Sequence, residues 1–169
     1  AQKERGVEVN GRLVVIGDHT KTPRDGRKIP ALTTLHQESE TGSKPSYFRG
    51  HHWGCVAMLA QTGRKFCSTP LEARIQEGNA GGDDRKSVQK TIQLVQMAQR
   101  LCARMQRKAY FILDAYFSVG PVFKQAARER RDGEQQVHIL TRAKKNIVAY
   151  LPPPKPRKKK RGRKKKYGR

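Results

Sequence analysis

The sequence predicts an α/β fold, in which helices flank a mixed β-sheet. Two short apolar runs each end in an aspartate, at Leu13 to Asp18 and at Tyr110 to Asp114. Between them, apolar residues recur at three- or four-residue spacing from about residue 85 to 108, which indicates an amphipathic helix. Two strands joined by a helical crossover can pair in parallel within one sheet.

The two runs that end in aspartate predict buried strands. Both are continuously apolar rather than alternating, which is typical of strands covered on both faces. Trp53 to Ala60 and Lys65 to Thr69 predict two further strands, separated by the turn signal Thr62-Gly63. Three strands are therefore expected before any helix.

Start and stop signals mark the helices. Asp83 and Asp84 precede the long helix, where acidic groups cap the backbone or favour the positive end of the helix dipole. Pro121 suits the first turn of a second, shorter helix, which we expect to end at Asp132-Gly133.

The C-terminal part changes character along its length. Val137 to Leu140 predicts a strand, and Asn146 to Leu151 another. Three prolines at 152 to 154 then break regular structure and precede a Lys- and Arg-rich run that cannot bury a core and repels itself. We therefore expect a folded core over residues 1–151 and a disordered tail over residues 152–169.

The charge of the chain points to a polyanionic partner. The 169 residues carry 37 Lys and Arg against 14 Asp and Glu, a formal charge of +23. Residues 153 to 169 hold 11 of the basic residues and no acid, so 26 basic residues remain in the rest of the chain. A neutral small-molecule enzyme does not need such a charge, whereas a nucleic-acid-binding protein does.

Cysteine spacing and the lengths of the apolar runs indicate where in the cell the protein is expected. Cys55, Cys67 and Cys102 are odd in number and form no C-x-x-C pair, so neither a disulfide framework nor a zinc site is expected. No apolar run approaches the roughly 18 residues needed to span a bilayer, and no leader opens the chain. We expect a cytoplasmic protein without a membrane partner, with upstream sequence missing because no methionine begins it.

The paired aspartates carry the expected chemistry. Asp18 and Asp114 should lie at adjacent strand ends, where ligands of open α/β sheets gather. Two carboxylates placed together repel unless a cation intervenes, and Mg²⁺ or Mn²⁺ is the natural candidate because it prefers hard oxygen ligands. A pair of such ions can activate the attacking group and stabilise the leaving oxygen of a phosphodiester. Taken singly, each aspartate could instead cap a turn.

Several motifs together carry a resemblance to a known family. They are Val15 to Lys21, Gly26 to Pro30, His36 to Ser39, Gly50 to Gly54, Phe111 to Phe117, Val137 to Asn146 and Val148 to Pro154. With these motifs the sequence resembles bacterial insertion-sequence transposases of the DDE superfamily along nearly its whole length. The resemblance implies an RNase H-like core, a metal-dependent cut-and-join reaction on transposon ends and target DNA, and Asp18 and Asp114 as the first two catalytic, metal-binding carboxylates. It also implies a nucleoid-associated protein that forms a homo-oligomer when full length.

The third acid of that family has no match. It is usually a glutamate on a later helix, whereas the last acid of this sequence, Glu134, precedes the Val137 strand. We therefore expect the 169 residues to be a C-terminally truncated transposase core that is inactive by itself.

Basic residues outside the aspartate pair are candidates for DNA contact. Lys21 and Arg24 follow Asp18 in an expected loop, and Arg142, Lys144 and Lys145 follow a strand end. Solvated loop charge is the alternative for these five. The tail adds nine further candidates: Arg157, Lys158, Lys159, Lys160, Arg161, Arg163, Lys164, Lys165 and Lys166.

Histidines near the expected site are weaker candidates for a functional role than the two aspartates. His51 and His52 are expected in a Gly-flanked turn, where a structural role is the alternative to DNA contact. His19 follows Asp18 directly and could orient a metal-bound water, whereas the alternative is that it points away, because neighbours on a strand point to opposite faces.

Two other functions remain open from the residues. One is a non-catalytic basic nucleic-acid-binding protein in which both aspartates are structural. The other is an RNase H-like nuclease of RNA or junctions, which would hydrolyse without strand joining. An activity that depends on metal would favour the transposase over the non-catalytic binding protein. Strand joining would favour the transposase over the nuclease.

Overall fold

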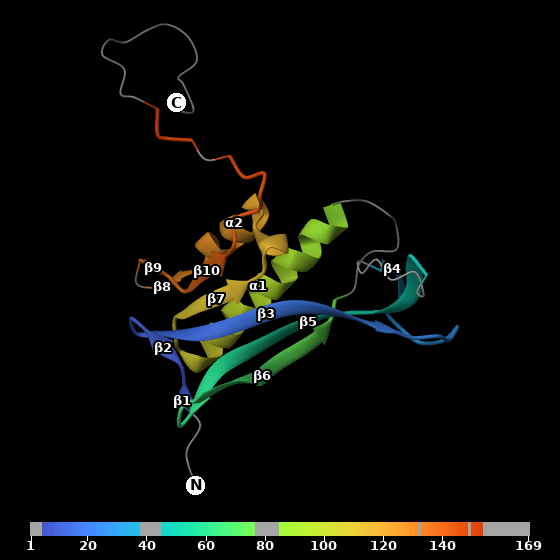
Figure 1. Cartoon of the computed structure of the whole chain (residues 1–169), viewed down its shortest axis with the longest axis horizontal. Helices are drawn as coiled ribbons and strands as arrows, with labels where there is room; N and C mark the ends of the chain where they lie inside the picture. The colour runs from blue at the N-terminus through green and yellow to red at the C-terminus, as the bar shows by residue number, and fades with distance from the viewer. Residues whose placement is uncertain (1–4, 38–44, 77–84, 132, 149, 154–169) are drawn as a thin grey trace, which may run out of the picture.

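The computed structural model describes residues 5–37, 45–76, 85–131, 133–148 and 150–153, and it shows a mixed sheet with two helices (Figure 1). The elements are β1 (Arg5–Gly6), β2 (Glu8–Val9), β3 (Arg12–Pro23), β4 (Thr33–His36), β5 (Tyr47–Thr62), β6 (Lys65–Ile75), α1 (Arg85–Met105), β7 (Ala109–Leu113), a 3₁₀ turn (Ala115–Phe117), α2 (Gly120–Arg128), β8 (Arg130–Arg131), β9 (Glu134–Gln135) and β10 (Val137–Thr141). This architecture confirms the expected α/β class and is consistent with an RNase H-like fold.

The two strands that end in aspartate are neighbours in the sheet. The main path runs β1-β5-β3-β7-β10, with β6 beside β5. β3 and β7 pair in parallel from Leu13 with Ala109 to Ile16 with Ile112, and β10 pairs in parallel with β7. The predicted parallel pairing through the α1 crossover is therefore confirmed.

The early strands are longer than their apolar runs. β3 continues past Asp18 to Pro23, and its antiparallel ladder with β5 runs from Val15 with Met58 to Pro23 with Gly50. Figure 1 shows β3 and β5 extending beyond the helices toward β4, whereas β6 ends earlier, at Ile75 opposite Trp53. Pairing satisfies the backbone of these polar segments, so hydrophobicity alone does not mark where such strands end.

The core lies between the helices and one face of the sheet. Phe111 and Leu113 of β7 form a single buried cluster with residues of α1 and α2. The helices are joined by reciprocal amide hydrogen bonds, since Gln99 Nε2 donates to the Gln125 carbonyl oxygen at 3.1 Å and Gln125 Nε2 donates to Gln99 Oε1 at 3.0 Å. Both helices thus contribute to one core, and α1 confirms the predicted amphipathic helix.

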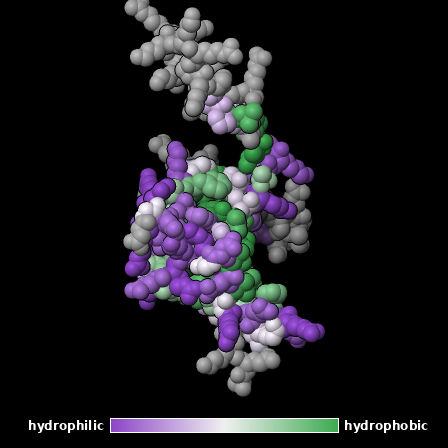
Figure 2. Space-filling view, turned by 90° about the vertical axis from the view of Figure 1, so that its left-hand side faces the viewer, coloured by the Kyte–Doolittle hydropathy of each residue, from purple (hydrophilic) through white to green (hydrophobic). Residues whose placement is uncertain are grey.

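The opposite face of the sheet is more open. Ile112 is 38% exposed and Leu140 is 48% exposed, and residues next to each other in a strand point to opposite faces. Figure 2, seen from the left-hand side of Figure 1, shows apolar surface between hydrophilic side chains. The expectation that both faces are covered is confirmed for the first half of β3, where the neighbours Val14 and Val15 are both buried, and is wrong for β7 at Ile112.

Other boundaries differ from expectation in the second half. α2 ends at Arg128 rather than at Asp132-Gly133, because β8 and β9 form a small hairpin around Gly133, whose φ is +78°. The expected strand at 146 to 151 is wrong for its described residues, which pair with no described strand; Val148 and Leu151 are 69% and 67% exposed. The tail from residue 154 and the acids Asp83 and Asp84 lie outside the described residues.

The predicted β5–β6 turn is confirmed. Gly63 occupies it with a φ of +61°, a left-handed conformation that favours glycine. Over the described residues, no helix is both long enough and apolar enough to cross a membrane.

Candidate active site

Asp18 and Asp114 line the same cleft. The last residues of β3 and β7 that pair are Ile16 and Ile112, and each aspartate lies two positions further along its strand direction. An open cleft of about 340 Å³ begins there. It is lined by Asp18, His19, Thr20, Lys21, Gln37, His52, Asp114, Tyr116 and Phe117.

A glycine lets the two strands stay together up to the aspartates. A Cβ at Gly17 would lie 2.3 Å from Cζ of Phe111 and 3.0 Å from Cδ2 of Leu113. Such contacts are far too short, so the Phe111 ring fills the space that a side chain at position 17 would need. The residue before Asp18 is therefore fitted to the strand that carries Asp114.

Each aspartate also makes a local hydrogen bond. One oxygen of Asp18 accepts from the His19 backbone N–H at 2.8 Å. Oδ1 of Asp114 accepts from the Tyr116 backbone N–H at 2.9 Å and caps the 3₁₀ turn, while its carbonyl oxygen accepts from Thr141 Oγ1 at 2.5 Å. A carboxylate has two oxygens with about four acceptor sites, so these turn contacts leave capacity for a cation.

The chemistry of this donor set fits one hard divalent ion. Mg²⁺ is commonly held by one or two carboxylates, with waters and a phosphate completing its shell. The exposed Asp18 and Asp114 carboxylates meet that requirement. Among the described residues, no group of three or more His, Cys, Asp or Glu side chains is placed to hold a metal ion.

Two histidines, His19 and His52, line the cleft. The expected turn at His51 and His52 is wrong, because both belong to the interior of β5 and are buried. The ring centroids of His19 and His52 lie 4.5 Å apart in an edge-to-face arrangement, and His19 lies 4.9 Å from Phe117. His19 thus lines the same cleft as Asp18, although it is the next residue on the strand.

The environment of His52 keeps its imidazole neutral. Burial, followed by the charges of His19, Lys90 and Lys21, lowers the pKa of His52 to about 3. The Gln76 amide opposes this shift in pKa, although its atoms fall short of hydrogen-bond geometry. Burial, followed by the charge of Lys21, also lowers the pKa of Lys90, although Lys90 does not line the cleft itself.

We expect His52 to make folding sensitive to acid. As the pH falls below the ordinary histidine pKa of 6.5, the unfolded chain binds a proton at this site, while the folded imidazole stays neutral until about pH 3. Stability is therefore lost progressively as the pH falls between these two values. Between pH 7.5 and 5, metal-free wild type should lose about 2 kcal/mol more than His52→Gln.

Urea unfolding of both proteins at the two pH values measures this difference. Carboxylates that titrate in the same window are common to both proteins and cancel in the comparison. Equal losses in the two proteins would show that His52 is not held neutral by the fold.

The basic candidates are spread more widely than expected. Lys21 lies within β3 rather than in a loop, and its Nζ donates to the His36 carbonyl oxygen at 2.9 Å. The Arg24 backbone N–H donates to the Arg49 carbonyl oxygen at 3.0 Å, and Arg24 does not line the cleft. The expected loop is wrong for Lys21, because the β3–β5 ladder continues through Pro23, and is confirmed for Arg24, which follows β3 outside any strand.

The remaining basic candidates lie outside the cleft or outside the described residues. Arg142, Lys144 and Lys145 follow β10 and do not line the cleft, although Thr141 before them contacts Asp114. The nine tail candidates from Arg157 to Lys166 lie outside the described residues.

Glu134 lies at the other end of the parallel strands. Its carboxylate contacts Nζ of Lys108 and lies 3.8 Å from Nη2 of Arg12. Lys108 directly precedes β7 and Arg12 begins β3, whereas the two aspartates lie just beyond the opposite end of the β3–β7 pairing. The ion pairs with Lys108 and Arg12 indicate a structural role for Glu134.

Sequence reasoning missed three side chains at or near the site. Gln37 reaches the cleft because β4 pairs with β5, and no local signal marks it. Lys90, on the first half of α1, does not line the cleft but interacts electrostatically with Lys21, and spacing alone gives it the character of a solvated helix residue. Tyr116 follows Asp114 closely, so its position beside the expected metal could have been inferred.

Comparison with known proteins agrees with this geometry. A family model described as DDE superfamily endonuclease matches residues 5–169. No functionally curated protein and no solved structure matches the chain. Since the family model spans nearly the whole sequence, the chain belongs to the DDE superfamily of endonucleases.

Proposed function

We propose that this chain takes part in DNA transposition, by metal-dependent cleavage of phosphodiester bonds and transfer of the cut strand. The observation that carries the proposal is that Asp18 and Asp114 occupy matched positions on adjacent parallel strands and line one cleft. Endonucleases of the DDE superfamily act on DNA and generally use divalent metal ions. The resemblance to bacterial insertion-sequence transposases supports the finer assignment.

Asp18 and Asp114 would hold Mg²⁺ or Mn²⁺. The ion would supply Lewis-acid stabilisation of the charge that develops on the phosphate oxygens. Without a cation the two carboxylates would repel the DNA backbone, so the metal also makes the cleft accessible to a phosphodiester.

Cationic side chains would position the DNA strand. Lys21 lines the cleft and is anchored by its hydrogen bond to the His36 carbonyl oxygen, which fixes its ammonium group near Asp18. Lys90 is partly buried, so water screens its charge less than that of an exposed lysine. Both would attract phosphate oxygens, while the neutral His52 ring forms part of the cleft wall without adding charge.

We infer that a third carboxylate must join the pair for catalysis. No acid follows Glu134 in the sequence, and Glu134 is engaged by Lys108 at the opposite strand ends. Two aspartates leave a second ion with too few protein ligands. A homo-oligomer, associated with the nucleoid in the cytoplasm, would bring the transposon ends together.

The response of DNA affinity to metal tests this proposal. In EDTA, the Asp18→Asn, Asp114→Asn double variant should bind a duplex several-fold more tightly than wild type, because two negative charges have left the cleft. Addition of Mn²⁺ should strengthen binding by wild type but not by the double variant. Elevated salt in both arms reduces the contribution of the basic tail.

Asp25→Asn is the matched control for charge. Asp25 is exposed and does not line the cleft, so this variant should respond to Mn²⁺ as wild type does. Fluorescence anisotropy with a labelled duplex measures the affinity of each of the three proteins in EDTA and in Mn²⁺. A double variant that gains as much affinity from Mn²⁺ as wild type does would refute the proposed role of the aspartates.

A further inference from the structure

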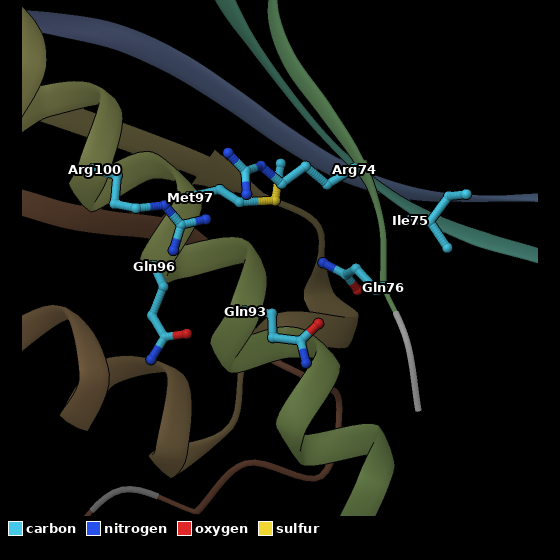
Figure 3. A pocket seen from close by; sticks show the side chains of 7 residues that line it. All are labelled: Arg74, Ile75, Gln76, Gln93, Gln96, Met97 and Arg100. Carbon is cyan, nitrogen blue, oxygen red and sulfur yellow. The ribbon is translucent and has the colours of Figure 1, made fainter. Parts of the chain in front are cut away.

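A second cavity lies between the end of β6 and α1, with a volume of about 270 Å³ (Figure 3). Its lining differs entirely from that of the cleft with the aspartates. The residues that give it chemical character are Arg74, Gln76, Gln93, Gln96, Met97 and Arg100. Amide and guanidinium groups thus surround a small apolar surface.

Gln76 is the strongest sign that this cavity binds something. Its side chain is 2% exposed, and among the described residues neither amide atom meets hydrogen-bond geometry, although the amide lies near enough to the His52 ring to affect its pKa. Leaving such groups unpaired inside a protein is costly, so a buried unpaired amide calls for an explanation. Figure 3 shows the Gln76 amide directed toward α1, into the cavity that it lines.

The backbone holds Gln76 in this position. Its N–H donates to the His52 carbonyl oxygen at 2.7 Å. Gly54 leaves room for the amide, since a Cβ there would lie 2.2 Å from Gln76 Nε2. The position of this amide is therefore built into the sheet.

Helix α1 supplies the facing polar groups. Gln93, Gln96 and Arg100 are spaced by three and four residues, so they lie on one side of the helix and line the cavity together. Glutamine amides both donate and accept hydrogen bonds, as the edges of nucleobases do. Met97 between them offers an adaptable apolar surface for a ring.

The arginines provide a net positive charge beside these amides. Nε of Arg74 contacts Oε1 of Glu72, and Nη2 of Arg100 lies 4.0 Å from the same oxygen. Two guanidinium groups share one carboxylate, which leaves one positive charge in excess. Guanidinium groups bind phosphate through paired N–H donors, and a phosphodiester carries one negative charge.

From this geometry, and resting on the proposed action on DNA, we propose that the cavity binds one unpaired nucleotide of the DNA strand. Arg74 and Arg100 would hold its phosphate, and the amides of Gln76, Gln93 and Gln96 would contact its base. A base inside a duplex is stacked and paired, so its edge reaches such a pocket only when it leaves the duplex.

The position of the cavity links it to the active cleft. His52 lines the cleft, and its carbonyl oxygen accepts the hydrogen bond from Gln76, which lines the cavity. A strand crossing this short wall would place the unpaired nucleotide next to the reacting phosphodiester. The cavity would thereby select DNA ends or distorted sites over continuous duplex.

The test compares a blunt duplex with one that carries a short unpaired extension, in EDTA, by fluorescence anisotropy. Wild type should prefer the extended DNA by roughly tenfold, and Arg100→Gln should lose most of that preference. Arg104→Gln is the matched control, because it removes the same charge from an exposed position of α1 outside the cavity. It should weaken binding to both DNAs equally.

Two further measurements test whether a variant has lost its fold and whether the cavity binds a free nucleotide instead of a DNA strand. Gln96→Ala, at a half-buried position of α1, should reduce the preference while the circular dichroism spectrum stays unchanged. Deoxyadenosine monophosphate should compete weakly with the extended DNA for binding to the protein, and should not compete with the blunt duplex. Tight binding of the free nucleotide by a wild type that shows no DNA preference would overturn the assignment to a DNA strand.

The result does not depend on the metal chemistry of the cleft. The Asp18→Asn, Asp114→Asn double variant should keep the preference for extended DNA, so failure of the proposed metal site leaves this measurement intact. An equal preference in Arg100→Gln and Arg104→Gln would overturn the nucleotide pocket while leaving the aspartate site standing.

Discussion

Truncation of the chain after Pro154 is expected to remove most of its sequence-independent affinity for duplex DNA. Residues 155 to 169 hold 11 Lys or Arg and no acid. Each phosphate that they neutralise releases counterions and contributes a slope of roughly −0.9 in log affinity against log salt. The full chain should lose on the order of 10³-fold in affinity between about 50 and 200 mM salt, whereas the truncated chain should lose far less.

A salt series measured by fluorescence anisotropy gives both slopes, which should differ by several units. The matched control changes the folded body instead, by replacing Arg142, Lys144 and Lys145 with glutamine. That variant should shift the slope much less, because it removes three charges rather than eleven. An unaltered slope after truncation would place the main DNA surface on the folded body.

The 169-residue chain is expected to leave supercoiled plasmid uncut, even when it is folded and supplied with Mn²⁺. Two-metal chemistry needs both ions at a fixed spacing of roughly 3.5 to 4 Å, and Asp18 and Asp114 alone do not provide ligands for both. Misplacing a reacting group by about 1 Å costs on the order of 10²-fold in rate, and loss of an ion removes further charge stabilisation. Nicking should therefore fall below detection.

Agarose gel analysis of plasmid topology makes this measurement, after size-exclusion chromatography has confirmed that the protein is not aggregated. The Asp18→Ala variant serves as the control for contaminating nuclease. Nicking by wild type that disappears in Asp18→Ala would show that two carboxylates are enough, and would contradict the requirement for a third.

The central strands and their aspartates could be predicted because local and global signals agree there. Leu13 to Asp18 and Tyr110 to Asp114 are apolar runs of strand length, and the amphipathic helix between them is long enough for a crossover. Chain geometry then brings the two strands together in parallel, with their carboxylates at one edge.

Residues that reach the site through pairing or packing could not be predicted in this way. β3 extends through the polar stretch from His19 to Pro23, which is stabilised by its ladder with β5 rather than by burial. That ladder places His52 opposite Lys21. Neither partner shows this register in its own sequence, because register depends on the whole hairpin.

Prediction failed where an apolar segment has no partner. Residues 146 to 151 have the composition of a strand, but no described strand lies beside them to complete a ladder. β-propensity reflects fit to a sheet surface, so it does not create a strand where that surface is missing.

Titration calorimetry with Mn²⁺ tests most directly whether Asp18 and Asp114 share one ion. Asp18→Asn and Asp114→Asn should each weaken Mn²⁺ binding by at least about tenfold, and the double variant should lose less binding free energy than the sum of the two single losses. Such non-additivity is expected when two residues act on the same ligand. Asp25→Asn should bind as wild type does. Unchanged Mn²⁺ affinity in the double variant would contradict the account.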